Sequence, residues 1–181
     1  LGPFAWTPVA APDFALPDAR QETVRREQYA GRPVVLIFYL GLGCLHCVEQ
    51  LEAFAPHAQA YADAGIELLG ISTDPLAKLR ESEARFGEFA ESGKFPFPLV
   101  SDAPLDVFRA YRAYDDFEQM PLHATVLIDG EGRIRSQDVS YEPFTEPEFL
   151  LHEVQRLLAQ DVDGELAGAA VSGSEHARTA D

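Results

Sequence analysis

Apolar runs that alternate with helical patterns predict a chain of interleaved strands and helices. Residues 34–40 (VVLIFYL) are apolar on both faces, as in a strand buried at the centre of an α/β sheet. Between residues 44 and 64, apolar positions recur every three or four residues, which predicts a helix. Pro56 should kink or split that helix, and Gly65 should end it.

The remaining pattern adds a second buried strand and several shorter elements. Residues 66–73 (IELLGIST) predict that strand, and Asp74-Pro75 is typical of the start of a helix, expected to reach about residue 90. The shorter elements are a hairpin from 13–16 and 22–25, a strand at 98–101, a helix at 105–111, a hairpin from 125–128 and 133–138 across Asp129-Gly130, and a final helix at 147–158. We therefore predict an α/β fold with a mixed central β-sheet flanked by helices and an N-terminal β-hairpin.

Composition along the chain divides it into three segments. Residues 1–12 carry three prolines and are expected to form an extended lead-in. Residues 13–160 hold all the predicted elements and form one domain. Residues 161–181 are rich in Gly, Ala, Ser, Asp and Glu, which predicts a disordered acidic tail.

The formal charge of −16, from 30 acidic and 14 basic residues, narrows the possible partners. Nucleic acids and anionic membrane surfaces both attract clustered cations, so we expect neither as a partner. No apolar run reaches the roughly 18–20 residues of a membrane span. An address signal upstream of Leu1 could have been removed, so the compartment of this soluble domain stays open between cytoplasm and periplasm.

Cys44 and Cys47 carry the most specific chemical signal in the chain. A structural zinc site normally uses two such pairs, or a Cys pair with a His pair, and a disulfide scaffold uses more cysteines. Here the pair follows a buried strand and a Gly-x-Gly turn, in the first turn of a predicted helix. Unpaired N–H groups and the helix dipole stabilise a thiolate there, which indicates a redox pair.

The segment at 38–51, FYLGLGCLHCVEQL, resembles the active-site strand, turn and helix of the peroxiredoxin-like AhpC/TSA family. It is most similar to a branch with the pattern aromatic-Tyr-x-Gly-x-x-Cys-x-x-Cys-x-x-Gln-Leu. The family's other core strands resemble residues 11–16, 70–74, 97–102 and 125–132. The resemblance implies a thioredoxin fold for the domain at 13–160 and reduction of peroxides or disulfides by cysteine. It also implies no cofactor and a thiol reductant such as thioredoxin.

The chain departs from the family pattern at three positions. If Cys47 attacks, Leu40 and Cys44 stand where the family usually has Pro and Thr. His123 stands where it usually has an Arg that helps bind peroxide and stabilise the thiolate. In a thioredoxin-like mechanism Cys44 attacks and Cys47 resolves. In a peroxiredoxin-like mechanism Cys47 becomes a sulfenic acid with which Cys44 condenses, and both mechanisms end in a Cys44–Cys47 disulfide.

His46 and His123 are the candidate supporting residues. As a cation, His46 would lower the thiol pKa values and make the pair more oxidising, whereas the alternative is a solvated side chain. His123 could donate to a thiolate or a bound oxygen, or could be a packed, hydrogen-bonded histidine.

The leading hypothesis is a thiol-dependent oxidoreductase that reduces peroxide or a protein disulfide by cycling Cys44 and Cys47. One alternative is a non-catalytic thioredoxin-like module of a longer protein, serving in binding or redox sensing. Another is a Cu(I)-handling protein, because two thiolates and an imidazole suit that ion. Copper-delivery proteins of this fold, however, usually separate their cysteines by three residues, and here the gap is two.

Overall fold

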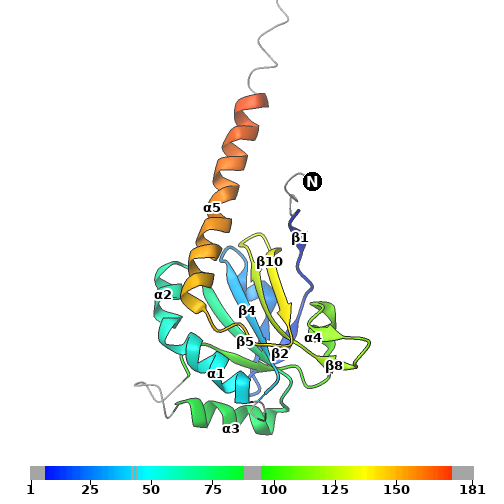
Figure 1. Ribbon diagram of the computed structural model, residues 1–181. Helices are drawn as coiled ribbons and strands as arrows, with labels where there is room; N and C mark the ends of the chain where they lie inside the picture. Colours follow the sequence, from blue (N-terminus) through cyan, green and yellow to red (C-terminus); the bar gives the residue numbers. More distant parts are fainter. Residues whose placement is uncertain (1–6, 42, 44, 88–94, 173–181) are drawn as a thin grey trace, which may run out of the picture. The chain divides into compact units, whose positions relative to one another are not determined.

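A mixed sheet forms the centre of the fold (Figure 1). The computed structural model describes residues 7–41, 43, 45–87 and 95–172. Within them, the sheet has the strand order β1-β10-β9-β4-β5-β6. Its strands are β1 (Val9–Ala10), β4 (Val34–Tyr39), β5 (Glu67–Ser72), β6 (Leu99–Ser101), β9 (His123–Ile128) and β10 (Arg133–Ser140). Strands β4, β5 and β6 run parallel, and β9 is antiparallel to β4 and β10, which confirms the predicted mixed sheet.

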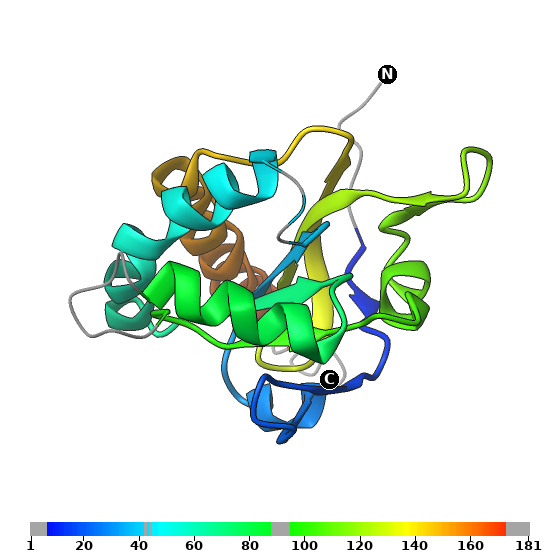
Figure 2. The ribbon, with the colours of Figure 1, turned by 90° about the horizontal axis from the view of Figure 1, so that it is seen from below.

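Helices cover both faces of this sheet (Figures 1 and 2). Right-handed crossovers from β4 to β5 and from β5 to β6 place their helices on one face, and α4 lies on the other. The elements are η1 (Arg26–Tyr29), α1 (Leu45–Phe54), η2 (Ala55–His57), α2 (Ala58–Asp63), α3 (Leu76–Gly87) and α4 (Asp106–Ala110). Pro56 interrupts the helix after β4, as predicted, because proline has no N–H to donate. Gly65 ends α2 with a φ of +73°.

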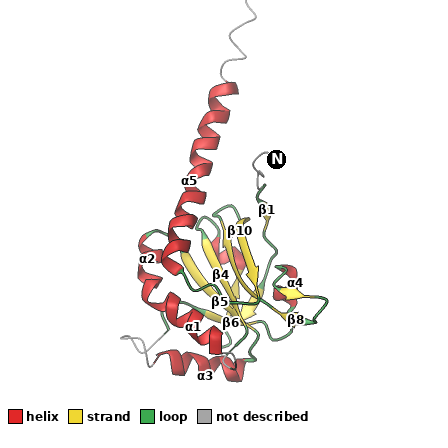
Figure 3. Cartoon of the chain, viewed as in Figure 1, coloured by secondary structure: helices red, strands yellow, loops and turns green. Residues whose placement is uncertain are grey.

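Two short ribbons flank the sheet (Figure 3). One pairs β2 (Ala15–Pro17) with β3 (Thr23–Arg25), which confirms the predicted N-terminal hairpin. Its turn is held by the Asp18 carboxylate, which accepts hydrogen bonds from the backbone N–H groups of Arg20 (2.9 Å) and Glu22 (2.8 Å). The other ribbon pairs β7 (Tyr114–Asp115) with β8 (Met120–Pro121).

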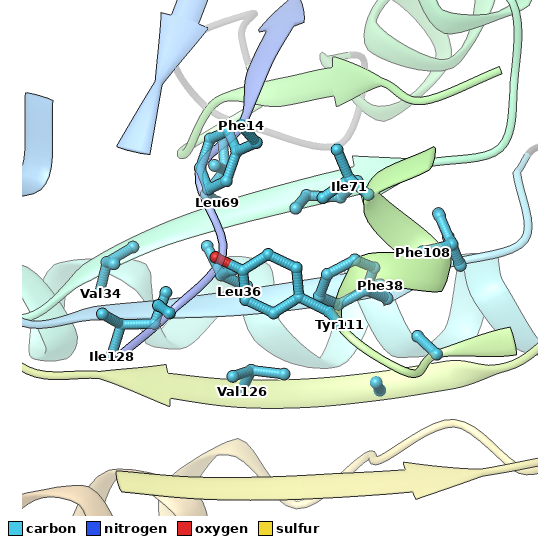
Figure 4. Close-up of a cluster of buried hydrophobic side chains, with 14 of the residues drawn as sticks. Phe14, Val34, Leu36, Phe38, Leu69, Ile71, Phe108, Tyr111, Val126 and Ile128 are labelled. Atoms are coloured by element: carbon cyan, nitrogen blue, oxygen red, sulfur yellow. The ribbon is translucent and has the colours of Figure 1, made fainter. Parts of the chain in front are cut away.

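The core on the α4 face of the sheet is built around β4 (Figure 4). Phe38 packs edge-on against Phe108, with ring centroids 5.0 Å apart, and lies 5.5 Å from the ring of Tyr111. All six residues of β4 are buried, as the unbroken apolar run predicts. Full burial of each large apolar side chain contributes about 1.5–3 kcal/mol, so this strand fixes the position of the turn and helix after it.

The N-terminal segment takes part in the sheet. We predicted an extended lead-in at 1–12, and within its described part Val9 and Ala10 form β1 at the sheet edge, opposite Ile134 and Arg133 of β10. A two-residue strand has too little apolar periodicity to be recognised in the sequence.

The last helix is longer than predicted. We expected it to end at 158 and to be followed by a disordered tail at 161–181, but α5 extends over Pro147–Ser172. The alanines and the leucine between 159 and 170 favour a helix, and two glycines there cost only about 1 kcal/mol each. Residues 173–181 lie outside the described part of the chain. The chain divides into two compact units, Leu1–Pro147 and Glu148–Asp181.

None of the helices in the described part of the chain combines the length and the apolar character that crossing a membrane would require.

Candidate active site

The predicted redox segment lies where β4 ends and α1 begins. Cys47 is the third residue of α1, so its backbone belongs to the first turn of this helix. That turn contains no acidic residue, and its unpaired N–H groups and the helix dipole favour an anion. Cys44 lies outside the described residues, and of Cys47 only the backbone is described.

The turn after β4 depends on a glycine and a buried carboxylate. Gly41 has a φ of +93°, and a Cβ at this position would overlap the Asp74 carboxyl group. Asp74 is only 6% exposed, and its backbone carbonyl accepts a hydrogen bond from Ser101 Oγ at 2.6 Å. Thr73 Oγ1 donates to the Leu40 carbonyl at 2.9 Å. The segment after β5 therefore holds the turn that leads to Cys47.

Asp74 was expected only as the start of a helix. Its contact with Gly41 was missed, because the sequence shows no link between two turns that follow different strands. The signal available was topological: parallel neighbouring strands end at the same edge of a sheet, and β4 and β5 pair with Tyr39 opposite Ser72.

His123 is brought to this same edge of the sheet by β9. Because β9 is antiparallel to β4, with Ala124 opposite Phe38, its first residue lies level with the end of β4. His123 is 3% exposed, and its Nδ1 lies 3.0 Å from the Tyr141 carbonyl oxygen. A carbonyl can only accept, so Nδ1 carries the proton in this hydrogen bond.

Burial lowers the pKa of His123, and the nearby His46 lowers it further. The Tyr141 carbonyl and the Glu142 carboxylate oppose this shift. The net lowering of the pKa favours a neutral imidazole. His123 is thus a packed, hydrogen-bonded histidine, and its expected action on a thiolate or a bound oxygen stays a prediction.

His46 is the second residue of α1 and is exposed. Its Nδ1 lies 3.8 Å from a carboxylate oxygen of Glu142, and the two side chains are 57% and 79% exposed. Exposed ion pairs of this kind contribute little to stability. The structure thus brings His46, Glu142 and His123 together at one edge, with His46 solvated.

Gln50 is a buried polar residue of α1 that we did not predict as a site residue. It lies three residues after Cys47, and its side chain is fully buried. Neither Nε2 nor Oε1 makes a hydrogen bond to any residue that the structure describes. The available signal was the Gln of the Cys-x-x-Cys-x-x-Gln-Leu pattern, to which we gave no separate role.

A metal site is not seen in the described part of the chain, where no three His, Cys, Asp or Glu side chains come together to hold an ion. Since that part includes neither Cys44 nor the side chain of Cys47, the Cu(I) alternative stays an untested prediction.

Comparisons with known proteins place this geometry among peroxiredoxins. The AhpC/TSA family matches residues 8–137. A Mycobacterium tuberculosis protein assigned to the peroxiredoxins is 31% identical over 130 residues, which cover 68% of this chain and 78% of that protein. Peroxiredoxin Q of Triticum aestivum is 32% identical over 125 residues, which cover 68% of this chain and 54% of the wheat protein.

Solved structures give the same result for the fold. The crystal structure of peroxidoxin BcpB from Mycobacterium tuberculosis superposes with a TM-score of 0.68 and 27% identity, over 83% of this chain and 96% of that chain. Peroxiredoxin Q of Xanthomonas campestris gives a TM-score of 0.65 over 79% of this chain and 90% of its own. At 23% identity the second similarity shows the fold alone. Together they confirm the predicted thioredoxin fold.

Proposed function

The chain belongs to the AhpC/TSA family, and from this premise we propose that it reduces hydroperoxides with the Cys44–Cys47 pair. The observation that carries the proposal is the place of Cys47, in the first turn of a helix that follows a fully buried central strand. A thiolate is the reactive form of cysteine, and this position favours it.

In the proposed reaction, the Cys47 thiolate attacks one peroxide oxygen. An S–O bond forms, the O–O bond breaks, and the leaving oxygen takes a proton and departs as alcohol or water. Cys47 is then a sulfenic acid. The Cys44 thiol attacks its sulfur, releases water and forms the Cys44–Cys47 disulfide. A protein dithiol of the thioredoxin kind restores both thiols by exchange and is itself oxidised.

His123 sets a limit on this reaction. The family usually has an Arg at this position, and Arg keeps its positive charge at all working pH values. A buried histidine with a lowered pKa is neutral, and because its Nδ1 proton goes to the Tyr141 carbonyl, its Nε2 atom can only accept a hydrogen bond. We therefore expect the Cys47 thiolate to depend on the α1 N-terminus, and peroxide reduction to be slower than with an Arg at position 123.

Stoichiometric hydrogen peroxide tests the proposal. The reduced chain should lose both free thiols and gain one intramolecular disulfide, measured by thiol counting and intact mass. Cys44→Ser should instead accumulate a sulfenic acid on Cys47 that dimedone traps. Cys47→Ser should keep its remaining thiol.

Other outcomes would change which cysteine is assigned as the attacking residue, or which reaction is assigned to the protein. Trapping of the sulfenic acid in Cys47→Ser rather than Cys44→Ser would make Cys44 the attacking residue. Thiols that resist peroxide but exchange with a protein disulfide would point to disulfide reduction. Thiols that react with neither peroxide nor a protein disulfide would support the alternative of a non-catalytic thioredoxin-like module.

A further inference from the structure

A short hairpin that leads into His123 exposes an aromatic ring. This hairpin, the β7–β8 ribbon, projects from the body of the fold (Figures 1 and 2). Its turn carries Phe117, which is 91% exposed, more than any other large apolar side chain in the described part of the chain. Met120 and Tyr141 are also exposed, and both adjoin Asp115, which pairs with Met120 and accepts a hydrogen bond from the Tyr141 hydroxyl. Phe117, Met120 and Tyr141 are called the hairpin patch below.

The turn of this hairpin is held in place, so the exposure of Phe117 does not come from a loose loop. Asp115 Oδ1 accepts hydrogen bonds from the backbone N–H groups of Phe117 at 2.8 Å and Glu118 at 3.0 Å. An aspartate that bonds the backbone in this way fixes a turn. Apolar side chains gathered on one surface and bordered by polar residues are typical of a site that binds another protein.

Described contacts link the hairpin patch to the start of α1. The Tyr141 carbonyl oxygen lies 3.0 Å from His123 Nδ1, while the hydroxyl of the same residue reaches Asp115. The next residue, Glu142, has a carboxylate oxygen 3.8 Å from Nδ1 of His46, the second residue of α1. A protein seated on the hairpin patch therefore lies beside the turn that precedes the helix of the proposed redox site.

The charges around the hairpin patch indicate the kind of partner. Residues 112–122 contain one cation, Arg112, against the carboxylates of Asp115, Asp116 and Glu118, and Glu142 adds a fourth carboxylate. The Tyr141 hydroxyl and two backbone N–H donors lower the pKa of Asp115, which keeps its carboxylate charged. The patch therefore fits a protein whose exposed apolar surface is bordered by Lys and Arg.

The same charges disfavour a second copy of this chain. Two copies that met at the hairpin patch would bring these carboxylates against each other, and each copy has a net charge of −16. Like charges placed opposite each other in an interface weaken it.

We propose that the hairpin patch is the docking surface for the thioredoxin-type protein that reduces the Cys44–Cys47 disulfide. This deepens the proposed function, on which it rests in taking the pair as a disulfide that a protein dithiol reduces. Phe117 enters the apolar surface of the reductant, and the carboxylates face its cations. One thiolate of the reductant attacks the disulfide, and its second thiol then displaces the mixed disulfide. The reductant leaves as a disulfide, and the pair gains two electrons and two protons.

The test compares a protein reductant with a small one. The Cys44–Cys47 disulfide is formed with diamide, and its reduction is followed by acid quenching, alkylation and intact mass. The reductants are a reduced bacterial thioredoxin and dithiothreitol. Only the protein can use a docking surface, so the ratio of the two second-order rate constants reports docking. In Phe117→Ser this ratio should fall about tenfold, the effect of losing one central apolar contact.

Phe149→Ser is the matched control. Phe149 is 60% exposed and belongs to α5, so this variant should keep the ratio of the unaltered chain. An unchanged ratio in Phe117→Ser, or an equal fall in both variants, overturns the proposal. So does an unaltered chain that thioredoxin reduces no faster than dithiothreitol does. A dimer that Phe117→Ser dissociates, seen by analytical ultracentrifugation, would make a second copy the occupant and also overturn it.

The charges are tested by neutralising two carboxylates of the turn. Asp116→Asn combined with Glu118→Gln should lower the ratio at about 10 mM sodium chloride, and the difference should shrink at about 150 mM, because salt screens the attraction. A higher ratio in the double variant would show repulsion and overturn the choice of partner.

Two further points keep the result clear. All substituted side chains are exposed, and Met120→Ser replaces Phe117→Ser if that variant does not fold. Because the disulfide is made with diamide, a chain that is inert to peroxide fails the proposed function alone, and an unchanged ratio fails the docking surface alone.

Discussion

Gly41 holds a backbone conformation that other residues adopt only at a cost. Its φ is +93°, and the Asp74 carboxyl group occupies the place of a Cβ. We predict that Gly41→Ala lowers the free energy of unfolding by more than the roughly 1–3 kcal/mol of backbone strain alone, because the carboxyl group must also move. Urea unfolding measures this.

Gly31 provides the matched control for this prediction. Its φ is +80°, but an added Cβ would meet nothing within 4 Å. Gly31→Ala should therefore show the strain without the overlap. Equal losses in the two variants would mean that Asp74 yields freely and does not support the turn before Cys47.

His123 should make stability depend on pH. Burial lowers its pKa in the folded state, so near pH 6.5, the ordinary histidine value, the unfolded chain binds more protons than the folded chain. The stabilising contribution of the neutral imidazole is complete above that pH and is lost as the pH falls toward the lowered value. The free energy of unfolding should accordingly decrease on acidification.

We predict that His123→Gln removes this part of the pH dependence. Between about pH 7.5 and 5.5, the unaltered chain should lose more stability than the variant, as measured by urea unfolding across that range. Parallel curves for the unaltered chain and His123→Gln would contradict the prediction.

At the scale of elements, Tyr111 joins α4 to the N-terminal segment. Its hydroxyl donates to the Pro12 carbonyl at 2.6 Å, while its ring packs on Phe38 and Phe14. Next to Pro12, the Ala11 N–H donates to the Gly132 carbonyl at 2.9 Å. The tyrosine thus supports the edge at which β1 pairs with β10.

We predict that Tyr111→Phe lowers stability by about 0.5–1.5 kcal/mol, the usual value of one hydrogen bond. Hydrogen exchange at Ala11 should become faster, because the edge strand opens more readily. Tyr61→Phe loses a similar bond, from its hydroxyl to the Pro147 carbonyl at 2.8 Å, and serves as control. Comparable exchange at Ala11 in both variants would show that β1 does not depend on Tyr111.

At the scale of the whole molecule, the net negative charge lowers the stability of the folded state. The chain carries 30 acidic and 14 basic residues, and a net charge of −16 repels itself most in the folded state. Salt screens this repulsion, with a Debye length of about 10 Å at 0.1 M. We predict that the urea midpoint rises when sodium chloride is raised from about 10 to 150 mM. A falling midpoint would mean that ion pairs such as Arg133–Asp129 outweigh the net repulsion.

Sequence patterns predicted those elements whose causes are local. The apolar run of β4, the division of a helix at Pro56 and the hairpin across Asp129-Gly130 each depend on neighbouring residues. The last helix was predicted too short, because the apolar periodicity ends near residue 160, whereas the alanines that follow still favour a helix.

By itself, the sequence determined the family, the thioredoxin fold and the place of the cysteine pair after the central strand. Those features depend on apolar periodicity and on a short motif that both lie along the chain. Only the tertiary structure decided that the Asp74 carboxyl group lies against Gly41, that His123 is buried against Tyr141, and that Gln50 is buried without a described partner. Burial and contact between distant segments exist only once the sheet has assembled, and they set the surroundings of the proposed redox site.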